Sequence, residues 1–339
     1  MPKPARVGMV GAGYFAGFQR AAWGRLEGAV LVGVAERDPA RRAALDVAGH
    51  DGLDALLAAE RLNILDIATP PETHADLIAQ ALGRVPLIIC QKPFCADLAT
   101  AQRMTAAARD AGTALVVHEN FRFQPWYREI AALLSAGRLG DVRQARFALR
   151  PGDGAGPDAY LDRQPYFRAM ERFLIRETGI HFVDTFRFLF GDPQAVYADL
   201  RRENPAIAGE DAGLVVFDLD GGGRAIFDGN RTLDHGAENR RLTMGELEIE
   251  GTGASVRLTG AGEIWIRDAG AVAAARHDFD FLDRDFGGDC VQAFQAHVLA
   301  GRATGRFETA AADYLANLRL EAAIYRSAAE GRKLGEGAL

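Results

Sequence analysis

The stretch ARVGMVGAGYFAGFQRAAWGRL, residues 5–26, joins an apolar run, a glycine-rich turn and a helical pattern. The run at 5–11 has the continuous apolar character of a buried strand, and the spacing of apolar residues predicts a helix over 14–26. A strand that leads through glycines into a helix is the opening unit of a parallel sheet wound with helices. The next question is whether the chain repeats this unit.

The unit is repeated along the first 121 residues. Further strands are expected at 29–36, 62–70, 86–93 and 113–120. Helical patterns separate them, and the clearest, at 97–112, begins with aspartate and ends with glycine. Strict alternation of strands and helices implies a parallel sheet with helices on both faces. We therefore predict a doubly wound Rossmann domain over residues 1–121.

The pattern changes after residue 121. A segment rich in Gly, Asp, Tyr and Arg at 151–173 is expected to cover a substrate, and strand-like runs split by glycine turns at 195–267 indicate an antiparallel sheet. Helices are expected at 177–191, 287–300 and 309–330. We predict a second, α+β domain over 122–339 for substrate binding and oligomerisation, with a large, open, mostly antiparallel sheet flanked by helices.

Composition narrows the class of function. The net charge is −7 and no basic stripe is visible, which argues against nucleic-acid binding. No apolar run approaches the ~20 residues of a membrane span. Three cysteines do not form a disulfide framework and the N-terminus shows no signal-peptide pattern, so a cytoplasmic location is expected. Cysteine and histidine do not cluster with zinc-ligand spacing, and no metal is expected.

The glycine turn carries a dinucleotide fingerprint, Gly11-x-Gly13-x-x-Ala16, in the required place between strand and helix. Gly11 permits the tight turn, Gly13 lets a pyrophosphate come close, and the helix N-terminus offers free N–H groups. Glu36 ends the second strand, where an acid accepts hydrogen bonds from ribose hydroxyls and repels a 2′-phosphate. Arg37 beside it can accommodate that phosphate, so NAD is favoured and NADP stays open.

Lys92 is one of only three lysines among 39 basic residues. It follows the fourth strand, at the edge of a parallel sheet where ligands bind. An amine can release its proton in a desolvated site or beside a positive charge, whereas a guanidinium is always protonated. We predict that Lys92 is a general acid–base; an ordinary surface lysine is the alternative.

His181 follows Glu177 by four residues, which puts both on one face of the expected helix. The carboxylate can orient the imidazole or bind a substrate hydroxyl, and the imidazole can relay a proton. A packed or surface helix histidine is the alternative. Asp184, three residues further on, is another candidate.

Several segments together resemble the glucose–fructose oxidoreductase/inositol dehydrogenase/MocA (Gfo/Idh/MocA) family, nearly from end to end. They are GAGYFA (11–16), ATPPETHADLIAQAL (68–82), CQKPF (90–94), ENFRFQPWY (119–127) and ETGIHFVDTFRFLFG (177–191). The resemblance implies that Lys92 is the catalytic lysine, assisted by His181 and Glu177, and that subunits pair as a homodimer or homotetramer. It implies cofactor contacts from Gly11, Gly13, Tyr14, Phe15, Glu36, Arg37, Thr69, Pro70, His74, Gln91, Lys92 and Asn120.

Two positions depart from the family pattern. Gln91 stands where a glutamate is usual, which removes a charge but keeps a hydrogen-bonding amide. Glu177 stands where many members have aspartate, which leaves open whether it reaches the substrate or only holds His181.

A finer pattern is similar to a subgroup of D-apiose dehydrogenases in this family. Its segments are NFRFQPWYRE (120–129), RQPYFR (163–168), RETGIHFVDTFR (176–187) and GGDCVQAFQAHVLAGR (287–302). The similarity implies oxidation of a branched aldopentose to its lactone. Contacts to the sugar hydroxyls would come from Arg122, Arg163, Tyr166, Arg168 and His181, with surface salt bridges as the alternative for the arginines.

The expected reaction is hydride transfer from a hydroxyl-bearing carbon of a sugar or polyol to NAD(P)⁺. Two alternatives stay open. One is reduction of a carbonyl, imine or biliverdin-like substrate on the same fold. The other is a catalytically silent dinucleotide-binding sensor, which Gln91 favours and the intact Lys92 and His181 oppose.

Overall fold

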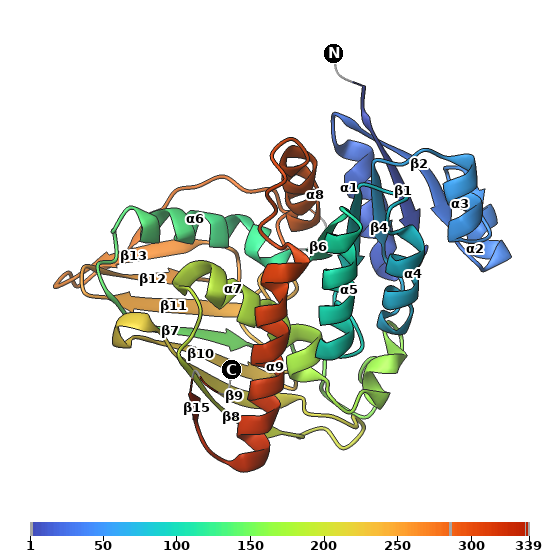
Figure 1. Ribbon diagram of the computed structural model, residues 1–339. Helices are drawn as coiled ribbons and strands as arrows, with labels where there is room; N and C mark the ends of the chain where they lie inside the picture. Colours follow the sequence, from blue (N-terminus) through green and yellow to red (C-terminus); the bar gives the residue numbers. More distant parts are fainter. Residues whose placement is uncertain (1–2, 285–286, 336, 338–339) are drawn as a thin grey trace. The chain divides into compact units, whose positions relative to one another are not determined.

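The computed structural model describes residues 3–284, 287–335 and 337. The chain forms two compact units, each with its own sheet (Figure 1). Unit 1 comprises Met1–Asn120 and Cys290–Ala316, and unit 2 comprises Phe121–Asp289 and Asn317–Leu339. Among the described residues, no helix combines the length and apolar character needed to cross a membrane.

Unit 1 is built on a sheet that has six strands in the described part of the chain. They are β1 (Ala5–Val10), β2 (Ala29–Ala35), β3 (Gly49–His50), β4 (Ile64–Ile67), β5 (Leu87–Gln91) and β6 (Ala114–His118). Their order is β3-β2-β1-β4-β5-β6, and each neighbouring pair is parallel. The predicted doubly wound sheet is confirmed; the sequence pattern did not reveal the two-residue edge strand β3.

The helices of unit 1 connect these strands or pack beside them. They are α1 (Tyr14–Arg25), α2 (Pro39–Ala43), α3 (Leu53–Ala59), α4 (His74–Ala81), α5 (Leu98–Asp110) and α8 (Cys290–Gly301), with a 3₁₀ turn at Pro71–Thr73. The strand order reverses between β1 and β4, because β2 lies on one side of β1 and β4 on the other. Open parallel sheets bind ligands outside the carboxyl ends of their strands at such a switch point.

Unit 2 contains a sheet with nine strands in the described residues. They are β7 (Val142–Leu149), β8 (Ala195–Arg201), β9 (Ala212–Asp218), β10 (Arg224–Asn230), β11 (Gly245–Gly251), β12 (Ala254–Leu258), β13 (Ile264–Asp268), β14 (Ala275–His277) and β15 (Leu334–Gly335). Their order is β14-β13-β12-β11-β7-β10-β9-β8-β15, with β7 and β10 parallel and the other neighbours antiparallel. The predicted large, mostly antiparallel sheet is confirmed.

Helices cover one face of this sheet (Figure 1). They are α6 (Pro125–Ser135), α7 (Ile180–Phe190) and α9 (Ala311–Glu330). Alternating strand residues point toward them, and Phe182 of α7 stacks on Phe147 of β7 and Phe227 of β10, with ring centroids 4.0 and 5.3 Å apart. Leu320 and Ile324 of α9 belong to the same buried core. Burial of these apolar side chains is the main stabilising term that holds α7 on the sheet.

The division of the chain differs from the expected one at its C-terminal side. The expected boundary after residue 121 lies close to the observed one after Asn120, but Cys290–Ala316 groups with unit 1 instead of the second domain. Two contacts explain this. Gln295 of α8 donates through Nε2 to the carbonyl of Gln19 in α1 (3.0 Å), and Thr309 exchanges hydrogen bonds with Val117 of β6.

The core of unit 1 contains a buried acid. Asp66 of β4 is fully buried, and its Oδ2 accepts a hydrogen bond from Nε1 of the buried Trp23 (2.8 Å). Its other carboxyl oxygen has no hydrogen-bond partner within the described residues. Burial raises the pKa of Asp66 to about 7, because the charged form loses its hydration. The folded protein therefore keeps this proton up to a higher pH than the unfolded chain does.

We expect the Asp66→Asn variant to be less sensitive to pH than the wild type. In the unfolded chain the carboxyl ionises near a pKa of about 4. Between about pH 4 and 7 the folded state binds more protons, so the free energy of unfolding falls as pH rises, by a few kcal/mol in order of magnitude. The amide cannot ionise, yet its oxygen still accepts from Trp23. The variant should therefore have the higher melting temperature at about pH 8 and lose that advantage at about pH 5.

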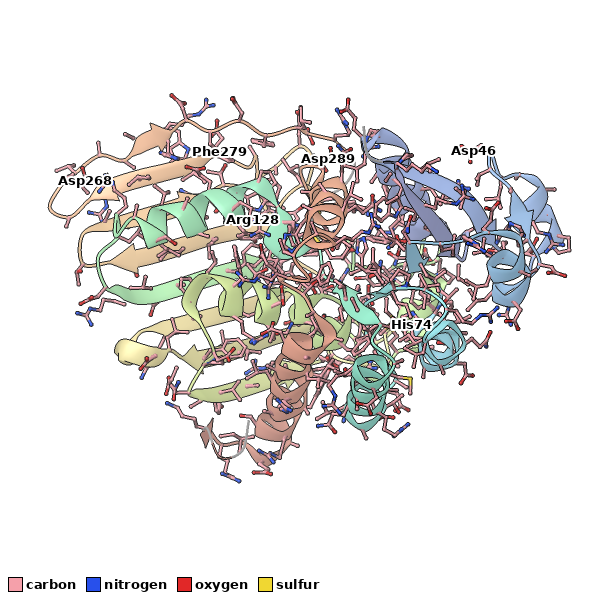
Figure 2. All side chains as sticks on the ribbon, turned by 45° about the horizontal axis from the view of Figure 1, so that its top comes forward. Asp46, His74, Arg128, Asp268, Phe279 and Asp289 are labelled. Atoms are coloured by element: carbon pink, nitrogen blue, oxygen red, sulfur yellow. The ribbon has the colours of Figure 1, made fainter. Side chains whose placement is uncertain are left out.

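Thermal unfolding followed by circular dichroism at both pH values measures this difference. Asp46→Asn is the matched control, since the Asp46 side chain lies at the surface (Figure 2) and is 90% exposed. Equal pH dependence in the Asp66→Asn variant and the wild type would show that Asp66 is already ionised in the folded protein.

Candidate active site

The glycine turn leaves room for a ligand beside the start of α1. Gly11 has a φ of 98°, and a Cβ there would lie 2.7 Å from the carbonyl oxygen of Ala68, so a side chain is excluded. A Cβ on Gly13 would meet nothing within 4 Å, and no side chain caps the helix that follows. The first N–H groups of α1 are thus suited to a pyrophosphate, next to Tyr14 and Phe15.

Glu36 is held in position beside this turn. One carboxylate oxygen accepts from the backbone N–H of Ala12 (2.8 Å) and the other from that of Asp38 (2.9 Å). Arg42 donates to the carbonyl oxygens of Glu36 and Arg37, which fixes the backbone after β2. The carboxylate therefore stands ready to accept from ribose hydroxyls, as the sequence predicts for an NAD site.

His74, expected to contact the dinucleotide, has both ring nitrogens within hydrogen-bond distance of backbone carbonyls. It is buried at the start of α4 (Figure 2), with Nε2 2.8 Å from the carbonyl oxygen of Thr69 and Nδ1 3.1 Å from that of Pro93. Burial lowers the pKa of His74, against the opposing effect of these carbonyl groups. The ring links the backbone after β4, where Thr69 and Pro70 lie, to the backbone beside Lys92. These bonds fix the position of the ring, and its contact with the dinucleotide stays a prediction.

Lys92 follows β5 directly and is half-buried. Its backbone N–H donates to Oε1 of Gln91 (2.7 Å), and the Lys92–Pro93 peptide bond is cis. The Gln91 side chain is buried, and its Nε2 has no hydrogen-bond partner in the part of the chain that the structure describes. A buried amide nitrogen is a donor that a ligand oxygen would satisfy, whereas the family's glutamate can only accept.

Asn120, also expected to contact the cofactor, is buried at the end of the first segment of unit 1. Its Nδ2 donates to the Sγ atom of Cys290 (3.0 Å). This bond joins the second residue after β6 to the first residue of α8. The geometry therefore favours a structural role for the Asn120 amide nitrogen.

In unit 2 the expected single helix over 177–191 is interrupted. Leu174–Gly179 forms a π-helix, called here the π turn, and α7 continues from Ile180. Glu177 and His181 therefore lie on opposite sides of a π–α junction, and the simple four-residue relation of an α-helix does not describe them. Short π segments of this kind are frequent at functional sites.

The π turn is held by a polar cluster in which Glu321 is buried and the other side chains are half-buried. The backbone N–H of Leu174 donates to the carbonyl of Glu210, and the Glu210 side chain accepts from the Tyr325 hydroxyl (2.6 Å). Arg176 forms an ion pair with Glu321 of α9 (3.0 Å). Such partners satisfy backbone and side-chain groups that a π turn leaves outside the regular helical pattern.

The ring of His181 is fixed by stacking. It lies flat against Phe121, with centroids 3.9 Å apart and an angle of 4° between the planes, and only 6% of the residue is exposed. Because the stacking sets the ring plane, the two nitrogen atoms can form hydrogen bonds only at the ring edge.

Arg122, expected to contact a sugar hydroxyl, is paired with a buried acid. Its Nε and Nη2 atoms bind the two carboxylate oxygens of Asp184, at 2.7 and 2.6 Å, and Asn317 donates to the same carboxylate (2.7 Å). All of these groups are buried. A bidentate, buried pair is costly to break, so Arg122 and Asp184 hold the start of unit 2 against α7 and α9.

The segment 151–173 carries the other expected sugar contacts. Arg163 pairs with Asp153 (3.2 Å), and Arg168 donates to the carbonyl of Ala206 (3.3 Å), which matches the salt-bridge alternative for the first arginine. Tyr166 is 57% exposed. Partial burial, and in second place the negative charge of Glu177, raise the pKa of Tyr166. Tyr166 is the member of this set that is most available to a ligand.

The sequence patterns thus divide between the two units. Lys92 and the glycine turn belong to unit 1, and Glu177, His181 and Tyr166 belong to unit 2. The hydrogen bonds of Arg231 with Thr178 and Asp153 escaped prediction. Thr178 lies in a quoted motif and Asp153 in the segment 151–173, but neither spacing nor residue type connects them with Arg231.

Comparison with known proteins assigns segments of both units to the family that the sequence motifs resemble. The model of the oxidoreductase family with an NAD-binding Rossmann fold matches residues 5–119, and that of the GFO/IDH/MocA C-terminal domain matches residues 127–257. D-apiose dehydrogenase from Rhizobium rhizogenes is 32% identical over 350 residues, covering 98% of this chain and 97% of the relative. D-apiose dehydrogenase from Paraburkholderia graminis is 34% identical over 336 residues, covering 96% and 88%.

Among solved structures, an oxidoreductase from Agrobacterium radiobacter in complex with NAD⁺, L-tartaric acid and magnesium is similar over 99% of both chains. Its TM-score is 0.89 and its sequence identity 30%. The family expected from the sequence motifs is thus confirmed, and so is NAD as the cofactor of its Rossmann domain. The chain is an oxidoreductase of the Gfo/Idh/MocA family.

Proposed function

We propose that this protein oxidises D-apiose or a closely related aldose to its lactone, with NAD⁺ as the hydride acceptor. Similarity to two D-apiose dehydrogenases over nearly the whole chain supports the substrate class. The observation that carries the chemistry is the position of Lys92. It follows β5 directly, at the carboxyl edge of the parallel sheet that also carries the glycine turn.

In this mechanism the amine of Lys92 accepts the proton of the anomeric hydroxyl, directly or through His181. A nicotinamide dinucleotide held by the glycine turn and Glu36 would supply the acceptor for the hydride that leaves the same carbon. The hydroxyl oxygen thus loses the proton and the carbon loses the hydride, and the C–O bond becomes the lactone carbonyl, so atoms and electrons balance. Glu177 orients His181 or a substrate hydroxyl. Tyr166, Arg163 and Arg168 are proposed to shape the side of the site that excludes water.

We further propose a homodimer or homotetramer that pairs through the face of the nine-stranded sheet opposite its helices. This face carries alternating charges, and Arg257 pairs with Glu246 across neighbouring strands (3.0 Å). Mixed charges of this kind can complement a second copy. A reducing, cytoplasmic location is proposed because the three cysteines are free and buried.

A substrate panel tests the function. The protein is incubated with NAD⁺ or NADP⁺ and with D-apiose, common aldopentoses, aldohexoses and myo-inositol, while the absorbance of the reduced cofactor is followed. We expect the highest kcat/KM for D-apiose with NAD⁺. Turnover only in the reducing direction, on a carbonyl or imine, would support the reductase alternative. Tight NADH binding without turnover of any carbohydrate would support the sensor.

A further inference from the structure

Arg231 is a buried cation at the centre of a polar cluster in unit 2. It follows β10 and is 2% exposed. Its Nε donates to the Tyr160 hydroxyl (2.6 Å) and, at 3.2 Å, to one oxygen of Asp153, whose other oxygen accepts from Nη2 (2.8 Å). Its Nη1 donates to Oγ1 of Thr178 (2.6 Å). One guanidinium thus binds three side chains from two different segments.

Aromatic rings enclose the same guanidinium. Its central carbon lies 4.8 Å from the ring centroid of Phe173, 5.3 Å from that of Tyr160 and 5.8 Å from that of Phe167. Removing a charge from water costs free energy even when the charge is paired. A protein with apolar side chains of similar size in place of the ion pair would often be at least as stable. Stability alone therefore gives a weak reason for an arginine here, and its planar set of donors gives a stronger one.

The partners of Arg231 lie in two segments that bear on the proposed reaction. Asp153 and Tyr160 belong to 151–173, the segment that carries Tyr166. Thr178 belongs to the π turn, one residue after Glu177 and three before His181. Backbone bonds fix Arg231 itself, because its N–H donates to Asp211 and its carbonyl accepts from Gly154, both at 2.9 Å. The guanidinium is therefore a rigid joint between the two segments.

We propose that Arg231 is a positioning residue that couples the segment 151–173 to the π turn, so that Tyr166 and Glu177 reach their working positions together. The proposal rests on the proposed function only for the kinetic consequence of this coupling. Arginine suits this coupling because its guanidinium N–H donors are fixed in one plane. A lysine offers a single ammonium at the end of a flexible stem and cannot hold a carboxylate, a phenol and a hydroxyl in fixed directions at once.

The hydrogen bonds of Arg231 to the π turn and to the segment 151–173 can be removed separately by substitution. Thr178→Val keeps the shape of the side chain and removes the acceptor on the π turn. We expect it to lower kcat by about tenfold with little change in KM, since a tenfold loss corresponds to about 1.4 kcal/mol, the order of one hydrogen bond to a charged group. Tyr160→Phe keeps the ring and removes the hydroxyl on the covering segment, so KM should rise while kcat changes less.

The double variant tests the coupling itself. Thr178→Val and Tyr160→Phe alter two residues that share Arg231 as their partner. If the joint couples them, the second substitution should reduce kcat/KM by less than it does alone. Multiplicative effects on kcat/KM would overturn the coupling. All variants should bind NADH as the wild type does, because the glycine turn and Glu36 belong to unit 1.

Hydrogen exchange followed by mass spectrometry tests the joint without any turnover. Arg231→Lys should accelerate amide exchange both in 151–173 and in 174–181, and Thr178→Val should accelerate it in 174–181. Arg267→Lys, an exposed site on β13, is the control and should change neither segment. Unchanged exchange in Arg231→Lys would overturn the proposal. If Arg231→Lys does not fold, unchanged exchange in Thr178→Val would overturn it instead.

These readouts separate the two proposals. If the wild type oxidises no carbohydrate, the proposed function fails, and the exchange data still decide whether the joint exists. If the wild type turns over a sugar and Thr178→Val and Tyr160→Phe have wild-type kcat and KM, the coupling by Arg231 is refuted and the function stands.

Discussion

Lys92→Arg should lower kcat by about 10²–10⁴, the contribution typical of a general acid–base group. The substitution keeps a positive charge and a long side chain at the end of β5. It removes the ability to give up a proton, because a guanidinium stays protonated at any pH at which the protein stays folded. Steady-state kinetics with the best sugar of the panel measures kcat, and fluorescence titration measures the dissociation constant of NADH.

The cofactor affinity separates loss of chemistry from loss of structure. The turn and carboxylate expected to hold the dinucleotide are formed by Gly11, Gly13 and Glu36, so the NADH dissociation constant should stay close to the wild-type value in Lys92→Arg. Lys333→Arg is a matched control, since Lys333 forms an ion pair with Asp218 at an exposed site. Wild-type turnover in Lys92→Arg would exclude the proton-transfer role of the amine.

The sequence was most informative where one local pattern repeats. In unit 1, apolar runs alternate with helical spacing, and the strands expected at 5–11 and 29–36 appear as β1 and β2. Buried parallel strands have to be apolar on both faces, so their signal is strong. The edge strand β3 escaped prediction because two residues carry no periodicity.

The domain division shows what local patterns cannot reveal. The helix expected at 287–300 appears as α8 over Cys290–Gly301, yet it belongs to unit 1. Its membership depends on contacts with α1 and β6, which lie more than half of the chain away in sequence. A helical pattern predicts that a face will be buried and does not tell against which partner.

Residue type and spacing predict roles for Lys92, Glu177 and His181, and these roles stay predictions. The π turn escaped prediction, because the same apolar spacing fits a regular helix. The tertiary bonds of Arg176 and Thr178 favour the wider turn. The sequence also does not reveal that Asp184 binds the guanidinium of Arg122, because the two residues are distant in sequence; the sugar contact of Arg122 stays a prediction.

His181→Phe is expected to lower kcat by about 10², at the lower end of the range for acid–base groups, and to leave NADH binding unchanged. Phenylalanine keeps the flat contact with Phe121, so the variant removes the two ring nitrogens with little change in packing. His277→Phe is the control. His277 also lies in unit 2, where it pairs with Glu129. Wild-type kcat in His181→Phe would show that the histidine is a packing residue.

Combining His181→Phe with Lys92→Arg distinguishes the two possible routes of the proton. If the hydroxyl proton reaches Lys92 through His181, the residues act as one unit, and losing the second should cost little once the first is gone. If Lys92 takes the proton directly and His181 only orients the sugar, the two losses in kcat should multiply. The comparison of four kcat values therefore assigns the relay, and it needs only that all four proteins bind NADH equally.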